Sequence, residues 1–181
     1  MHNQQISEVQ SHKHLGILLS NNCTWHSHIQ YIMDKAWSRI KVMRKLKYQL
    51  DRRSLETIYT SFIRPLLEYG NTIWDNCTNY EKHELEKIQH EAARIATGTT
   101  KLVSINNLNT EVGWESLETR RTKHKLIIFY KMVNHMTPPY LSTLVPSQIG
   151  EHSPYNIRNS YDLQIPSSRT VLDYNSFMPS V

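Results

Sequence analysis

The sequence predicts a mainly α-helical bundle, with one or two short strands at its N-terminal end and an irregular C-terminal arm. Apolar residues recur at spacings of three and four over long stretches, which is the period of an amphipathic helix. Glycine accounts for only 5 of 181 residues, a composition that disfavours turn-rich β-sandwiches. Six of the 7 prolines lie from Pro138 onward, so we expect the regular bundle to end before them.

A strand and a long helix are predicted first. Residues 13–19, with the sequence KHLGILL, predict one short buried strand, and Asn21 and Asn22 supply turn chemistry behind it. From about His26 to Leu46 the apolar residues fill one arc of a helical wheel, which predicts a long amphipathic helix with a basic outer face. These apolar residues are Ile29, Ile32, Met33, Ala36, Ile40, Met43 and Leu46.

The second predicted helix contains a proline. Ser54 is a suitable N-cap for it, because its hydroxyl can accept from a free amide of the first turn. Pro65 should kink or split this helix, and Gly70 should end it. Its broad apolar face consists of Leu55, Ile58, Tyr59, Phe62, Ile63, Leu66 and Leu67.

Two longer helices and one short helical piece complete the predicted bundle. Asn79 is expected to cap a third helix over 80–97, and Gly98 to stop it. A short piece follows around 104–111. A fourth long helix is expected over 114–135, because its second half is apolar nearly all round and two consecutive prolines follow it.

The hydropathy pattern argues against a membrane or secreted protein. No apolar run approaches the ~18 residues that a membrane span needs, and the polar start of the chain lacks the apolar region of a signal peptide. We therefore expect an intracellular chain, in the nucleus or the cytoplasm, with no membrane partner. Cys23 and Cys77 are expected to be free thiols.

The positive charge is concentrated in one stretch. The chain carries a formal charge of +5. The stretch from Lys35 to Arg53 alone carries +7, since it contains eight basic residues and one acidic residue, Asp51. Such a patch can attract polyanions, although a solvated helix face would give the same pattern. The eight basic residues are Lys35, Arg39, Lys41, Arg44, Lys45, Lys47, Arg52 and Arg53.

The sequence predicts neither a metal site nor a catalytic site. His12 with His14 and His26 with His28 each offer two imidazoles, but no cysteine pair or carboxylate stands at a spacing that would complete a metal site. The five aspartates are scattered singly, whereas two-metal phosphoryl transfer needs carboxylates that hold two cations together. We predict no catalytic residue and no metal ligand.

Five sequence blocks stand out between residues 12 and 178. They are HLGILL with TWHSHI, YTSFIRPLLEYG with IW, LEKIQHEAARIATG, LETRR with FYK, and IPSSRT with SF. In this order they resemble the region downstream of the catalytic palm motif in reverse transcriptases of non-LTR (LINE-type) retrotransposons of the jockey kind. The family commonly has Tyr at the position of His14, and its aromatic-Ala-Asp-Asp motif does not occur in these 181 residues.

The resemblance implies a fragment of an RNA-directed DNA polymerase. Residues 1–22 would be the end of the palm with its last strand, 23–136 a thumb-like helical domain, and 137–181 an extended, truncated arm. The Mg²⁺ of the parent polymerase would be held by palm aspartates that this sequence lacks, so we expect no cofactor in this chain. By itself the chain is expected to be inactive, and its missing palm and fingers would be partners.

The resemblance and the charge pattern together point to nucleic-acid binding. We expect the eight basic residues between Lys35 and Arg53 to contact the phosphates of RNA and of RNA–DNA hybrids. Trp37, beside the basic arc, is the best candidate for stacking on a base. A secondary, weaker group of candidate contacts consists of Arg120, Arg121, Lys123 and Lys125.

A second interpretation stays open beside this one. The chain would then be a non-catalytic helical module that binds a protein partner, or the product of a decayed element without activity. A helical domain separated from its palm should expose apolar surface and bind hydrophobic dyes. A self-contained interaction module should instead be soluble and melt cooperatively.

Overall fold

The computed structural model describes residues 8–151, 155, 158–170 and 176–178, and it confirms a mainly α-helical fold. The chain divides into two compact units, Met1–Arg120 and Arg121–Val181, and each is considered by itself. The boundaries after residues 22 and 136 stay predictions. Parts of the predicted palm and arm segments lie outside the described residues, namely 1–7, 152–154, 156–157, 171–175 and 179–181.

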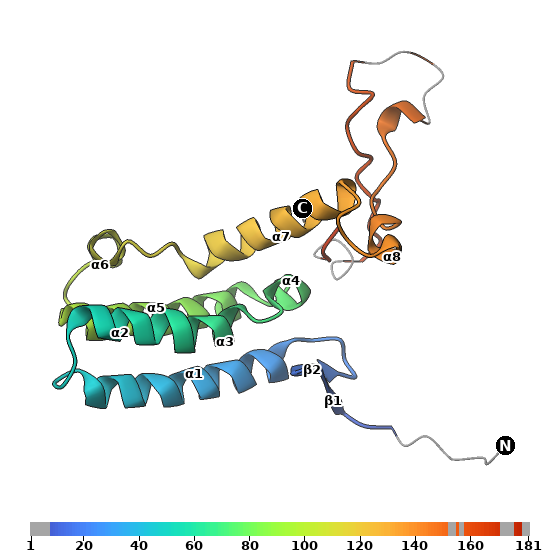
Figure 1. Cartoon of the computed structure of the whole chain (residues 1–181). Coiled ribbons are helices and arrows are strands. Elements are labelled where there is room, and N and C mark those ends of the chain that lie inside the picture. Colours follow the sequence, from blue (N-terminus) through green and yellow to red (C-terminus); the bar gives the residue numbers. More distant parts are fainter. Residues whose placement is uncertain (1–7, 152–154, 156–157, 171–175, 179–181) are drawn as a thin grey trace. The chain divides into compact units, whose positions relative to one another are not determined.

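Helices dominate the first unit (Figure 1). In chain order its elements are β1 (Ser11–His14), β2 (Ile17–Ser20), α1 (His26–Leu46), α2 (Arg52–Ile58), the π-helical η1 (Tyr59–Ile63), α3 (Arg64–Glu68), α4 (Asn71–Trp74), α5 (Asn79–Thr97) and α6 (Ile105–Val112). The next helix, α7 (Leu117–Val133), begins in this unit and continues into the second.

The predicted single strand over 13–19 is wrong, because the segment forms an antiparallel hairpin. Ser11 pairs with Ser20 and His14 with Ile17, so the chain reverses at Leu15 and Gly16. Both turn residues have positive φ, 46° and 88°, as a tight two-residue hairpin turn requires. Leucine is an unusual residue in such a position, and the apolar run therefore concealed the turn.

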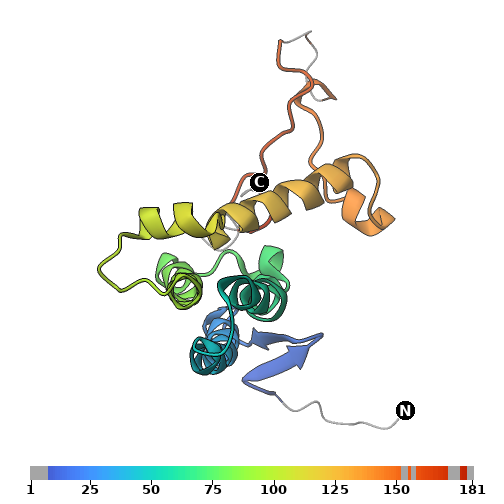
Figure 2. The ribbon, with the colours of Figure 1, turned by 60° about the vertical axis from the view of Figure 1, so that its left-hand side comes forward.

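Three helical rods build the core of the first unit. Figures 1 and 2 show α1, the continuous α2–η1–α3 rod and α5 side by side. The predicted bounds of the first long helix, 26–46, are confirmed. Its apolar arc supplies fully buried side chains that meet those of the other two rods. The core includes Ile29, Ala36, Ile40, Met43, Leu55, Tyr59, Ile63, Leu67, Leu85, Ile88 and Ala92.

The proline interrupts the second rod as predicted. Pro65 lies in the first turn of α3, directly after the π-helical turn η1. A proline lacks the amide hydrogen and crowds the preceding turn, and a π-turn accommodates that break without ending the rod. The rod begins at Arg52, not after Ser54, so Ser54 is an internal residue rather than the predicted N-cap. Gly70 adopts a left-handed conformation, φ 62°, where the rod ends.

The third rod begins one residue before the predicted position. Thr78, not Asn79, caps α5, and it forms a reciprocal capping box with Glu81. The Glu81 amide donates to Thr78 Oγ1 over 3.2 Å, and the Thr78 amide donates to Glu81 Oε2 over 2.8 Å. The predicted stop at Gly98 is confirmed by its left-handed backbone, φ 72°.

The second unit contains most of α7, followed by an irregular arm of the kind that the sequence predicts. The helix begins at Leu117, three residues after the predicted 114, and ends at Val133. The arm contains α8 (Pro139–Ser142) and the 3₁₀ helix η2 (Ile149–Glu151), and an isolated bridge joins Gln148 to Leu163. No helix in the described ranges is both long and apolar enough to span a bilayer.

Candidate nucleic-acid interface

The predicted basic residues of α1 and α2 fall into three groups, which differ in what surrounds them. Lys41 and Lys45 lie on the face opposite the buried arc, because successive residues turn by about 100°. Both are exposed, and neither has a hydrogen-bond or ion-pair partner in the described part of the chain. The Arg53 side chain, at the start of α2, is exposed in the same way. These three cations are therefore available to an external anion.

A second group faces the hairpin and the η1 turn. The Lys35 ammonium lies 4.2 Å from the Tyr31 ring centroid, and the Arg39 guanidinium lies 4.0 Å from that of Phe62. Arg39 also donates to the carbonyl of Phe62. Lys13 and Lys35 both donate to the Tyr31 hydroxyl, and these hydrogen bonds lower the pKa of Tyr31 to about 8. Lys13 thus connects the hairpin to α1, and Arg39 connects α1 to η1.

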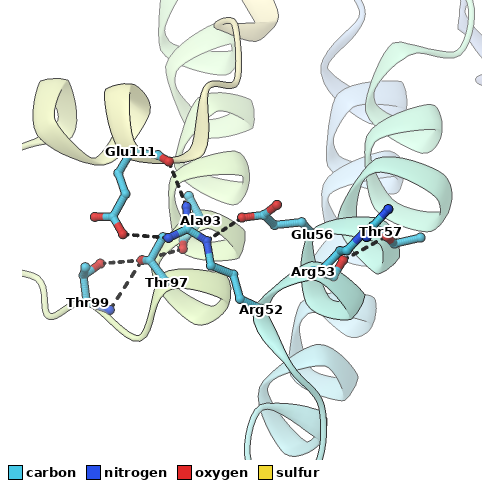
Figure 3. A network of polar contacts seen from close by, with 8 residues as sticks. All are labelled: Arg52, Arg53, Glu56, Thr57, Ala93, Thr97, Thr99 and Glu111. Carbon is cyan, nitrogen blue, oxygen red and sulfur yellow. Dashed lines mark hydrogen bonds and ion pairs between the residues drawn. The ribbon is translucent and has the colours of Figure 1, made fainter.

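A third group is neutralised by carboxylates. Arg44 Nη2 lies 2.6 Å from Glu91 Oε1 and so ties α1 to α5. Arg52 Nε donates to Glu56 over 2.7 Å, and its two terminal nitrogens reach a carboxylate oxygen and the carbonyl of Glu111 at 2.9 and 2.8 Å (Figure 3). The hydrogen bond to Glu56 is the main cause of the raised pKa of Arg52. Arg52 thus fastens α2 to α6.

Packing of α1 on α5 creates a basic pocket that the sequence did not reveal. It has a volume of about 260 Å³ between the C-terminal ends of the two helices. Arg94, in the last turn of α5, and Lys101, three residues after Gly98, join Arg44 and Lys47 around it. The remaining lining residues are Tyr48, Glu91, Ile95, Thr99 and Thr100. Sequence reasoning missed Arg94 and Lys101 because both lie outside the basic run.

Hydroxyl contacts shape the loop that brings Lys101 to the pocket. Thr97 Oγ1 donates to the carbonyl of Ala93 over 2.9 Å and lies 3.0 Å from Thr99 Oγ1 (Figure 3). The first bond lies within the last turn of α5, and the second contact reaches past Gly98 into the loop. The chain after Gly98 is thereby held close to the helix end.

The remaining predicted contacts divide between buried and surface positions. Trp37 is half-buried and packs against the core, so only part of its ring is open to solvent. Arg120 binds Glu68 in a bidentate pair, with Nη2 at 3.0 Å from Oε2, and this hydrogen bonding raises the pKa of Arg120. Arg121 and Lys125 are buried and Lys123 is exposed.

Two histidines that the sequence analysis considered as metal ligands make structural contacts. His28 is buried, its Nδ1 accepts from the Leu18 amide over 3.3 Å, and burial lowers its pKa. His26 Nδ1 lies 3.2 Å from Glu81 Oε1. Within the described ranges, no group of three or more His, Cys, Asp or Glu side chains converges in a way that could hold a metal ion.

Comparisons with known proteins returned no match to this chain, whether made with family models, with curated proteins or with solved structures.

Proposed function

We propose that this chain is the thumb-like part of a reverse transcriptase of the non-LTR retrotransposon class, and that it holds RNA and RNA–DNA hybrids through their phosphates. The observation that carries the proposal is a continuous basic surface on α1 and α5, called here the α1–α5 basic face. It consists of the two exposed lysines of α1 and the four cations of the pocket, namely Lys41, Lys45, Arg44, Lys47, Arg94 and Lys101.

Helix geometry supports the continuity of this face. Residues three or four apart are neighbours on a helix surface, so Lys41 lies next to both Arg44 and Lys45. Arg44 in turn lies in the pocket wall with Arg94 of α5. A row of cations of this kind suits a polyanion that can contact several of them at once. Contacts to phosphates fix the position of a nucleic acid but do not depend on its sequence.

The experiment is fluorescence anisotropy of the 181-residue chain with a labelled RNA–DNA hybrid. The variant Lys41→Ala/Lys45→Ala is expected to weaken binding about tenfold or more at low salt, because it removes two available phosphate contacts. The matched control is Lys82→Ala/Lys87→Ala on α5, which removes the same charge from lysines already paired with Asp75 and Glu84. Equal affinities of the two variants would contradict the proposal.

A second candidate function rests on a different surface. Near the hairpin turn, Leu15 is 76% exposed, and Tyr69 and Ile73 are also exposed. The Tyr69 hydroxyl donates to the Leu15 carbonyl over 2.7 Å, so Tyr69 and Leu15 lie together. They suit a protein partner. If the chain binds no nucleic acid, is soluble and melts cooperatively, this candidate is favoured.

A further inference from the structure

The basic pocket at the ends of α1 and α5 offers more than a row of phosphate contacts would need. Its volume of about 260 Å³ lies just below the range of about 300–1,000 Å³ of small-molecule sites. Four cations and the single carboxylate of Glu91 leave a formal charge of +3 on its walls. Ile95 adds an apolar surface among these polar groups. The pocket therefore suits an anion that also carries an apolar or aromatic part.

Arg94 has a donor that lacks an acceptor. Its Nε is buried, and no hydrogen-bond partner for it exists among the described residues. Buried donors of charged groups are costly when left unpaired. Arg44, across the pocket, is already bound by Glu91 at 2.6 Å. Of the two guanidiniums, Arg94 is the one that forms no ion pair with a carboxylate among the described residues, so its positive charge is not offset.

An aromatic ring stands at the rim of the pocket. Tyr48 is 88% exposed, and the Lys47 ammonium lies 6.0 Å from its ring centroid. Exposed aromatic rings beside cations form stacking surfaces for the bases of single strands, since every base presents a π-face. Inside a duplex the base faces are covered by neighbouring pairs, so a ring of this kind stacks on unpaired bases and not on the interior pairs of a duplex.

We propose that this pocket receives one unpaired nucleotide of a single-stranded RNA or DNA segment. Its phosphate binds Arg94 and Lys101, and its base stacks on Tyr48. The inference rests on the proposed function, which it deepens by naming a single-stranded segment as the ligand of this part of the α1–α5 basic face. Cations at the carbonyl ends of helices also stabilise those ends, so the test must separate binding from stability.

The test measures anisotropy of the full chain with a labelled single-stranded oligonucleotide and with a blunt-ended duplex of the same length. Tyr48→Leu is expected to weaken single-strand binding about fivefold or more, the loss of one stacked base, and to leave duplex binding unchanged. Tyr48→Phe keeps the ring and should retain the wild-type affinity for both. Because the side chain is almost fully exposed, both variants should fold.

A second pair of variants tests the phosphate contacts. Arg94→Gln should weaken single-strand binding, whereas Glu91→Gln should strengthen it several-fold, because it removes the only carboxylate of the pocket and releases Arg44. Thermal melting of each variant reports stability separately. A pocket that only stabilises the helix ends would change the melting temperature in Arg94→Gln and leave both affinities unaltered, which overturns the inference.

The outcomes distinguish this inference from the proposed function. If the wild type binds both ligands and Tyr48→Leu affects both equally or neither, the pocket does not hold an unpaired nucleotide, and the proposed function stands. If the wild type binds neither ligand, the proposed function fails and this inference fails with it.

Discussion

His28, in α1, binds the hairpin through its Nδ1 atom, which acts as a hydrogen-bond acceptor. Its Nδ1 accepts from the Leu18 amide, and its ring lies at centroid distances of 6.4 and 6.2 Å from Trp25 and Trp74. Burial lowers its pKa below 6.5, so the unfolded chain binds the proton at a higher pH than the folded chain does. The free energy of unfolding should therefore fall as the pH drops below about 6.5.

Replacement of His28 tests this dependence. His28→Asn keeps an acceptor near the Nδ1 position but cannot titrate. In urea titrations, the unfolding free energy of this variant should therefore change less between pH 7 and pH 5 than that of the wild type. His90, whose pKa is also lowered, chiefly by burial, acts in the same direction and should leave part of the slope. His12→Asn, at an exposed strand position, serves as the control. An unchanged slope in His28→Asn would contradict this account.

Gly70 is a second position where one residue decides the packing. A Cβ atom there would lie 2.9 Å from Ile17 Cδ1, and the backbone has φ +62°. Gly70→Ala therefore adds a clash to the left-handed strain of about 1–2 kcal/mol. Gly98→Ala meets nothing within 4 Å at φ +72° and carries the strain alone. Urea unfolding should show a larger loss for Gly70→Ala, and equal losses would mean that the hairpin does not pack closely there.

At the scale of elements, the structure and the sequence prediction differ in which residue caps the start of α5. Thr78→Ala removes the hydroxyl of the capping box and should lower the unfolding free energy by about 1 kcal/mol. Asn79→Ala changes the residue that the sequence favoured as the cap, and it should have little effect because Asn79 lies inside the helix. If Asn79→Ala lowered the unfolding free energy more than Thr78→Ala does in thermal or urea unfolding, Asn79 and not Thr78 would be the N-cap of α5.

Helix interiors were predictable where local signals were strong. The apolar arc from Ile29 to Met43 fixed α1, and glycine at position 98 fixed the end of α5, because both signals act within a few residues. The starts of α2, α5 and α7 differ from the predicted ones by one to three residues, since several neighbouring polar residues can serve as caps. The turn at Leu15 escaped prediction because leucine is not a turn residue, and because the Tyr69 hydroxyl that donates to the Leu15 carbonyl comes from a distant part of the sequence.

The candidate site was predictable only in part, for a reason that lies in tertiary packing. A run of charge along the chain identified Lys41 and Lys45, which the structure leaves exposed and unpaired among the described residues. The same run included Arg52, which two glutamates neutralise. Arg94 joins the pocket only because α5 packs on α1. The sequence shows where basic residues are dense along the chain. Which of them form ion pairs, and which line the pocket, depends on contacts between segments that are distant in sequence.

At the scale of the whole molecule, a modest formal charge of +5 conceals a surface with a strongly uneven charge distribution. The acidic residues of α5 and α6 pair with Arg44 and Arg52 and so brace the bundle. The α1–α5 basic face is left with an excess of positive charge. Binding of nucleic acid should therefore be electrostatic, tolerant of sequence and strongly weakened by salt.

The most direct measurement is the salt dependence of binding to an RNA–DNA hybrid, for the wild type and for Lys41→Ala/Lys45→Ala. The logarithm of the binding constant should fall linearly with the logarithm of the salt concentration, since bound cations release counterions. The variant's slope should be shallower by about 2, one for each lost phosphate contact. A flat response in the wild type, or the same slope in both proteins, would contradict the claim that this face holds nucleic-acid phosphates.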